Sequence, residues 1–194
     1  MATRFGSARA RRRMNGQNDD FTVLISEARR LRFENPAEAQ RLFEKAVEES
    51  RKQGSPQKLI QALKGVGQIA RDLRANDLAL RLYQEAVALC RTENDDLLLA
   101  HTVRHVGDIH QDMKRDDLAA PCYEEALGIY RSHRETSKLD LANSVRPFAL
   151  LKENAGAIDE AKQMWAEARD LYAAASVPEG VKECSRRLAL LENA

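Results

Sequence analysis

The sequence predicts an all-α protein, a stack of antiparallel helix pairs, and three observations support this class. A motif of small, aromatic and small residues at positions i, i+4 and i+7 recurs four times, and residues at this spacing share one helical face. Successive copies are offset by 40, 40 and 42 residues, a fixed period typical of stacked repeat proteins. No segment shows a clear strand pattern. The copies are Ala39, Phe43 and Ala46; Ala79, Tyr83 and Ala86; Ala119, Tyr123 and Ala126; and Ala161, Trp165 and Ala168.

A glycine stands twelve positions before the second and third copies, at Gly67 and Gly107, with apolar residues one and four positions before it. This pattern resembles the tetratricopeptide repeat (TPR) family, whose consensus is W-x2-L-G-x2-Y followed by A-x3-F-x2-A. The resemblance covers about residues 19–176. The period is similar to that of the longer variant in kinesin light chain-like proteins, and the family resemblance implies a right-handed superhelical solenoid. Leu63 and Val103 take the family's tryptophan position, and Ala70 and His110 its tyrosine position.

The repeats divide the chain into a basic tail, residues 1–18, and one helical domain, residues 19–194. A capping helix should close the stack, because the last segment is apolar on one side and charged on the other. With four helix pairs and this cap, nine helices are expected. The TPR-like pairs are predicted at about 19–54, 55–94, 95–134 and 137–176, and the capping helix at 179–192.

Local signals mark several helix ends. Asn35 and Pro36 supply an N-cap and a proline at the first helical position, and residues 54–56, Gly-Ser-Pro, end the helix that follows. Pro121 is expected near the first turn of its helix, where a missing N–H is tolerated. Pro147 falls inside a helix and should kink it.

Composition bounds the cellular context. Residues 1–18 contain five arginines and no acid, and the remaining 176 residues contain 26 basic and 30 acidic side chains. The tail could bind nucleic acid, an acidic membrane surface or an acidic partner, or be a transit peptide. The preferred interpretation is a disordered segment with no role. The chain has no apolar run long enough for a membrane span and no apolar segment typical of a secretory signal. Three distant cysteines favour reduced thiols in a cytoplasmic protein.

No catalytic motif is evident, since the chain lacks a Gly-rich phosphate loop and any recognisable Cys–His or Ser–His arrangement. The prediction is therefore a protein that is not an enzyme and uses no cofactor. One cluster offers an alternative: His101, His105, Asp108 and Asp112 follow one helix at i, i+4, i+7 and i+11. These side chains could hold zinc or another transition metal. Polar groove residues are the preferred interpretation, because nothing completes a closed ligand set.

The first helices of the pairs line the groove in a TPR stack, and their polar stripe is the candidate binding surface. Lys64, Arg104 and Arg146 take equivalent positions and should form a row of cations. Such a row suits an acidic peptide or a C-terminal carboxylate. The carboxylate clamp of chaperone-binding TPR proteins matches only at Lys64 and Gln68, so chaperone binding is not predicted. The stripe comprises Gln61, Lys64, Gln68 and Arg71; His101, Arg104, Asp108 and Gln111; and Asn143, Arg146 and Leu150.

The first functional hypothesis is a non-enzymatic adaptor that binds a peptide or protein segment in this groove. The alternative is a nucleic-acid-associated regulator that uses the Arg-rich tail, with the repeats as an oligomerisation or sensor module. Salt-sensitive nucleic-acid binding that disappears on deletion of residues 1–18 would favour the alternative. Neither hypothesis names the partner, because fold does not imply function.

Overall fold

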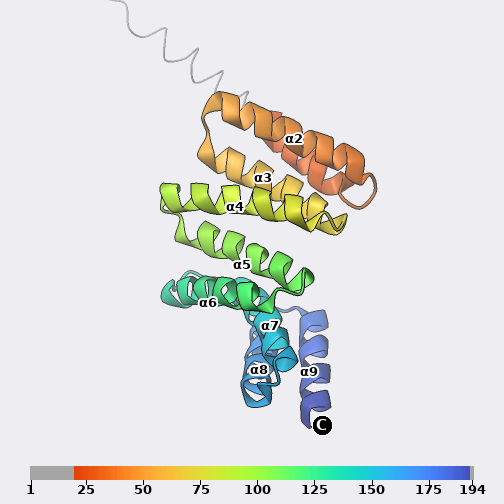
Figure 1. Cartoon of the computed structure of the whole chain (residues 1–194), viewed down its shortest axis with the longest axis vertical. Helices are drawn as coiled ribbons and strands as arrows, with labels where there is room; N and C mark the ends of the chain where they lie inside the picture. Colours follow the sequence, from red (N-terminus) through yellow and green to blue (C-terminus); the bar gives the residue numbers. More distant parts are fainter. Residues whose placement is uncertain (1–19, 193–194) are drawn as a thin grey trace, which may run out of the picture. The chain divides into compact units, whose positions relative to one another are not determined.

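The computed structural model describes residues 20–192, and all regular secondary structure in that range is helical (Figure 1). A first helix covers residues 20–31. The chain divides into two compact units, Met1–Leu89 and Cys90–Ala194. The remaining helices are α2 (Pro36–Gln53), α3 (Pro56–Asp72), α4 (Asn76–Glu93), α5 (Asp96–Asp112), α6 (Asp116–Ser132), α7 (Lys138–Asn154), α8 (Ile158–Ala174) and α9 (Pro178–Glu192). The prediction of an all-α helical repeat protein is confirmed.

The first unit contains the helix at residues 20–31, α2, α3 and most of α4. Asn35 caps α2, since its side chain accepts a hydrogen bond from the Glu38 amide, and Gly54 ends the helix in the left-handed conformation with φ 61°. Arg32 and Asp72 form a two-pronged ion pair, with nitrogen–oxygen distances of 2.6 and 2.9 Å. This pair joins the loop after the first helix to the end of α3.

The second unit contains α5 to α9, which follow one another as pairs with α9 packed on α8. Its main core is aromatic and aliphatic, and it fills the space between the helices. Trp165 on α8 is the largest side chain in this core and is 1% exposed. From α9, Cys184 and Leu191 enter the same core, so this last helix covers the Trp165 pair.

The glycines that precede the second and third aromatic motifs have a direct packing role. A Cβ atom on Gly67 would lie 2.8 Å from the ring of Tyr83, and one on Gly107 would lie 2.8 Å from the ring of Tyr123. Gly180 on α9 receives the ring of Tyr172 in the same way. The glycines therefore let the paired helix bring its ring against the backbone, where any side chain would collide.

Within each unit, arginines that recur every 40 residues form ion pairs with acids. Arg51 pairs with Glu85 at 2.7 Å in the first unit. In the second unit, Arg91 pairs with Glu125 at 2.8 Å and Arg131 with Glu167 at 2.9 Å. All these side chains are well exposed, so each pair contributes at most about 1 kcal/mol. These ion pairs were not predicted, although their arginines follow the period of the repeat.

The turns inside the helix pairs also repeat. Arg74 and Lys114 have left-handed φ values of 62° and 59°, and Gly156 takes the equivalent turn with φ 76°. Only the last of these is the residue type that favours this conformation. The sequence therefore marks one of the three turns, and the other two are held by the packing of the helices they join.

Pro121 and Pro147 both lie inside helices. Pro121 was expected near the first turn of its helix, but α6 begins at Asp116, so this proline is the sixth residue and lies beyond the first turn. Pro147 lies inside α7, which runs without interruption from Lys138 to Asn154.

Of the cysteines, Cys90 and Cys184 are buried, Cys122 is half-buried, and all three are free. None of the helices within residues 20–192 combines the length and the hydropathy needed to cross a membrane.

Candidate binding surface on the first helices of the pairs

The predicted surface residues of α5 are half-buried or buried and contact one another. Arg104 donates to Asp108 with a nitrogen–oxygen distance of 2.9 Å, and their side chains are only 13% and 10% exposed. Asp108 also lies 3.2 Å from Nδ1 of His105. The rings of His101 and His105 lie 4.8 Å apart. The Arg104 charge is therefore largely neutralised inside the unit instead of facing a partner.

Tyr123 fixes two further residues of the predicted surface. Its buried hydroxyl lies 3.1 Å from Oδ1 of Asp108 and 3.2 Å from Oε1 of Gln111. The Gln111 amide in turn donates to the carbonyl of Pro147 on α7 at 3.2 Å. Because these groups satisfy one another, Asp108 and Gln111 hold α5, α6 and α7 together.

On α7 the two predicted polar residues have different roles. Asn143 accepts a hydrogen bond of 2.9 Å from the Tyr172 hydroxyl of α8. Arg146 reaches Glu183 on α9, with Nη1 at 3.1 and 3.3 Å from the two carboxylate oxygens. The Arg146 and Glu183 side chains are 40% and 36% exposed. Burial alone would lower the pKa of Arg146, but the charge of Glu183 and the hydrogen bond to it, together with Tyr172 and Asp108, outweigh burial and the pKa is raised.

Arg146 also keeps hydrogen-bonding capacity. Only its Nη1 is engaged, and within residues 20–192 the Nη2 and Nε groups make no hydrogen bond. The guanidinium group is thus held in place by one contact and presents its other donors. It is the accessible cation of this surface in the second unit, in contrast to Arg104.

Leu150 on α7 is half-buried against the core of the second unit, and the remaining predicted residues lie on α3 in the first unit. Gln61, Lys64, Gln68 and Arg71 are all half-buried. Gln68 donates to Asp72 at 3.1 Å and lies 3.5 Å from the Tyr83 hydroxyl, so it belongs partly to the packing of the unit. The first unit therefore repeats the pattern seen on α5, in which the polar residue near the tyrosine hydroxyl is structural.

The alternative metal site is not assembled in the described part of the chain. No group of three or more His, Cys, Asp or Glu side chains within residues 20–192 has the arrangement of a metal site. Asp108 is instead engaged by Arg104, His105 and Tyr123. The basic tail, residues 1–18, lies outside the described residues.

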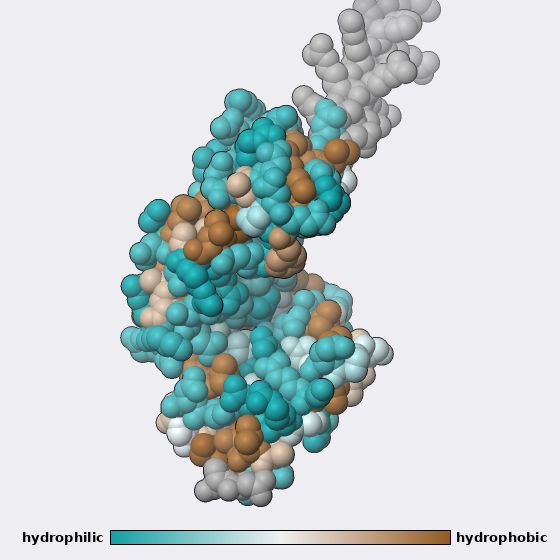
Figure 2. Space-filling view, turned by 90° about the vertical axis from the view of Figure 1, so that its right-hand side faces the viewer, coloured by the Kyte–Doolittle hydropathy of each residue, from teal (hydrophilic) through white to brown (hydrophobic). Residues whose placement is uncertain are grey.

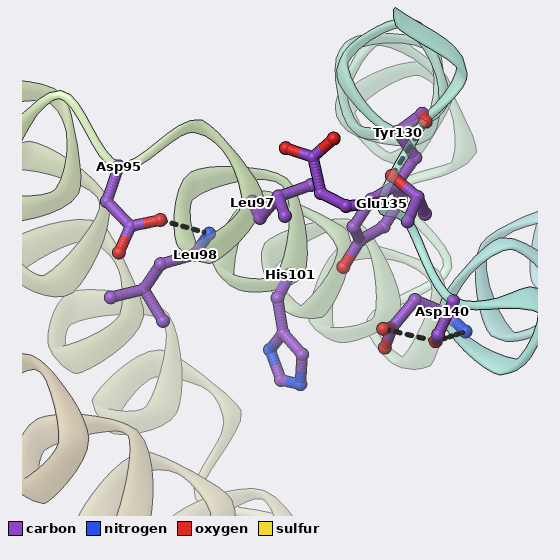
Figure 3. Close-up of a pocket in the computed structure, with 9 residues that line it drawn as sticks. Asp95, Leu97, Leu98, His101, Tyr130, Glu135 and Asp140 are labelled. Atoms are coloured by element: carbon purple, nitrogen blue, oxygen red, sulfur yellow. Dashed lines mark hydrogen bonds between the residues drawn. The ribbon is translucent and has the colours of Figure 1, made fainter. Parts of the chain in front are cut away.

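A cavity of about 360 Å³ opens beside the surface in the second unit (Figure 3). It lies where the start of α5, the end of α6 and the loop before α7 meet. His101, one of the predicted surface residues, forms part of its wall. The other lining residues are Asp95, Leu97, Leu98, Tyr130, Glu135, Thr136, Ser137 and Asp140. Sequence reasoning missed this cavity, because it depends on the path of the loop at residues 133–137.

The visible face in Figure 2 is mostly hydrophilic, and its hydrophobic residues form small separate patches. A partner that recognises this face would therefore use polar and charged contacts around limited apolar area, since large exposed apolar patches are the usual mark of a hydrophobic interface.

The arrangement of the helices defines a class, an α-helical repeat protein of antiparallel pairs in which an aromatic residue of each second helix packs against its pair mate. The family model for the tetratricopeptide repeat matches residues 59–132. Residues 59–132 are therefore tetratricopeptide repeats, as the sequence pattern predicted, and the neighbouring helix pairs have the same fold as solved structures with TPR-like repeats. Repeats of this family are protein-interaction scaffolds, and the chain has that architecture.

Solved structures show the same fold at low sequence identity. Aspartyl phosphate phosphatase F from Bacillus subtilis superposes with a TM-score of 0.79 at 14% identity, over 86% of this chain and 44% of that one. A putative kinesin light chain with nearly identical TPR-like repeats from Podospora anserina gives 0.66 at 14% identity, over 89% and 95%. A signal transduction ATPase (STAND) with a tetratricopeptide repeat sensor from Pyrococcus horikoshii gives 0.71 at 16% identity, over 90% and 26%.

The chain thus spans less than half the length of the Bacillus subtilis protein and about a quarter of the Pyrococcus horikoshii protein. No curated protein matches the sequence. At these identities the likeness shows the fold alone, and the partner must be argued from the surface.

Proposed function

We propose that this protein is a non-enzymatic adaptor that binds a segment of another protein along the first helices of its repeats. In the second unit these are α5 and α7, continued by α9. Contacts of Gln111 with Pro147 and of Arg146 with Glu183 connect the three helices. A rigid surface of this kind loses little conformational entropy on binding, which favours affinity.

The observation that carries the proposal is Arg146. Its guanidinium is held by Glu183, is 40% exposed, and keeps Nη2 and Nε available. A carboxylate of the partner could accept from both free groups, and such two-pronged contacts are among the stronger charge-assisted hydrogen bonds. We therefore expect the bound segment to carry an acidic side chain opposite Arg146.

Of the three cations in the predicted row, only Arg146 is assigned here to contact with the acidic residue of the partner. Arg104 is paired with Asp108 and 13% exposed, so its role is to shape the surface. Lys64 lies in the first unit, and its predicted contact with the partner does not depend on the contact at Arg146. The acidic character of the ligand thus depends mainly on Arg146, which a single substitution can test.

The experiment selects peptides from a random 12-residue display library on the immobilised full chain. Enriched peptides are then measured against the protein, Arg146→Gln and Arg169→Gln. Arg169 is the matched control because its side chain is also 40% exposed and also pairs with one acid, Asp170, but it lies on α8. We expect acidic residues among the enriched peptides and about a tenfold loss of affinity for Arg146→Gln alone. Peptides that bind both variants as they bind the parent would refute the proposal.

A further inference from the structure

The cavity beside α5 carries an inference about the chemistry of the partner. Tyr130 of α6, Asp140 of α7 and His101 of α5 border the same space (Figure 3). Its volume of about 360 Å³ lies in the range of small ligand pockets. The space is therefore sufficient for one long side chain of a bound segment.

The most informative wall residue is Tyr130. It is only 2% exposed, and its ring packs with Ala100 and Ala126. Yet within residues 20–192 its hydroxyl makes no hydrogen bond. The hydroxyl itself is not fully enclosed, so water or a ligand in the cavity can supply its missing partner. Burial, and then the nearby Asp140 charge, raises the pKa of this hydroxyl, so it stays protonated.

The charge of the cavity selects the kind of ligand. Three carboxylates line it, from Asp95, Glu135 and Asp140, and none of its nine lining residues is a lysine or arginine. Two helix N-termini also border the cavity, which by itself would favour an anion. Those N-termini are already served by their own caps: Asp95 accepts from the Leu98 amide at 3.0 Å, and Ser137 accepts from the Asp140 amide at 3.0 Å. A cation is the complementary ligand.

Acceptor atoms remain available for such a cation. Asp95 uses one oxygen in its cap, and Asp140 uses Oδ2 to accept from the Ser137 hydroxyl at 2.6 Å. Within the described residues the other oxygen of each, and both oxygens of Glu135, make no hydrogen bond. Leu97 and Leu98 supply an apolar wall against which the methylene stem of a long basic side chain can pack.

We propose that this cavity binds an arginine side chain of the partner segment. The planar guanidinium has five donors, which suits acceptors placed on three helices and a loop. The proposal depends on the adaptor function for the source of the side chain, and it adds a second anchor to the acidic residue expected at Arg146. Asp140 of the cavity and Arg146 both lie on α7, six residues or about 9 Å apart along its axis, so one bound segment can reach both anchors.

The test is an NMR titration of the full-length ¹⁵N-labelled protein with N-acetyl-arginine methylamide. N-acetyl-citrulline methylamide is the neutral isostere, and N-acetyl-aspartate methylamide is the anionic probe. We expect the arginine probe to shift the amide signals of Leu98 and His101 with a dissociation constant of about 1–10 mM, as for a fragment of few atoms. The citrulline probe should bind at least about fivefold more weakly, because charge-assisted hydrogen bonds are lost.

Three variants make the result specific. Tyr130→Phe removes only the hydroxyl, and Glu135→Gln removes one exposed charge, and each should weaken the arginine probe by roughly three- to tenfold. Glu124→Gln, an exposed acid on α6 that does not line the cavity, should leave binding unchanged. Equal shifts from arginine and citrulline, stronger shifts from aspartate, or no shift up to about 50 mM would each overturn the proposal.

Failure here can be distinguished from failure of the adaptor function. Arg146→Gln should leave the arginine titration unchanged, since Arg146 does not line the cavity. Selected peptides could likewise depend on Arg146 while the cavity binds no guanidinium, which would refute only the arginine pocket.

Discussion

The substitution Gly107→Ala tests the packing of aromatic residues on the repeat glycines. The new Cβ would lie 2.8 Å from Cε1 and 3.0 Å from Cδ1 of Tyr123, and 3.1 Å from Cβ of Cys122. The ring cannot easily move aside, because Tyr123 is fully buried and its hydroxyl is held by Asp108 and Gln111. Relief of the collision must therefore break hydrogen bonds or displace α6, a penalty of about 1–3 kcal/mol for an overpacked core.

Gly128→Ala is the matched control. Gly128 is exposed on α6, and a Cβ there would contact nothing within 4 Å. Both substitutions gain the same helix propensity, roughly 0.5–1 kcal/mol, so the difference between the two variants isolates the collision. Urea unfolding followed by the fluorescence of Trp165, the single tryptophan, reports on the second unit. The reasoning is refuted if Gly107→Ala is as stable as Gly128→Ala.

Three further perturbations test other parts of the structure. Trp165→Ala should lower the free energy of unfolding by about 3–5 kcal/mol, because a 1%-exposed ring and its 2.9 Å hydrogen bond to Glu153 are lost. The measurement is denaturant unfolding followed by circular dichroism, and a loss below about 1 kcal/mol would contradict the core position of Trp165. Burial, and then the charge of Arg115, lowers the pKa of His110 from 6.5, so the unfolded chain takes up the proton first and stability falls as the pH drops below about 6.5. His110→Gln should therefore lose less stability between pH 7 and pH 5 than the parent protein. The same pH profile of stability in both proteins would contradict a role of His110 in this loss. Lys114→Gly should raise the unfolding free energy by about 1 kcal/mol, since φ is 59° there, and a decrease would show that the side chain stabilises the turn.

Sequence periodicity was sufficient for the fold class and the family. The four aromatic motifs and the glycines before two of them carry the packing information directly, because Gly107 and Tyr123 are in contact in the folded protein. The same period also contained the Arg91–Glu125 and Arg131–Glu167 pairs, which the search for apolar positions overlooked. A search for charged residues at the repeat spacing would have found them.

The candidate site was harder to predict, because a polar residue on a helix face can point to a partner or to a neighbouring helix. Arg104 and Arg146 hold equivalent sequence positions, yet their side chains are 13% and 40% exposed. The difference arises because Arg104 has Asp108 one turn away on its own helix, whereas Arg146 reaches an acid on α9. The cavity depends on the loop at residues 133–137, whose path no periodic pattern describes.

The central claim is that Arg146 receives an acidic group of the bound segment, and a double-mutant cycle tests it most directly. The cycle combines Arg146→Gln with neutralisation of the acidic residue in a selected peptide, and affinities are measured by calorimetry at one salt concentration. The account predicts a coupling energy of about 1 kcal/mol or more for Arg146, and one near zero for Arg169→Gln with the same peptide change. A coupling energy near zero for Arg146 with every acidic position of the peptide would contradict the account.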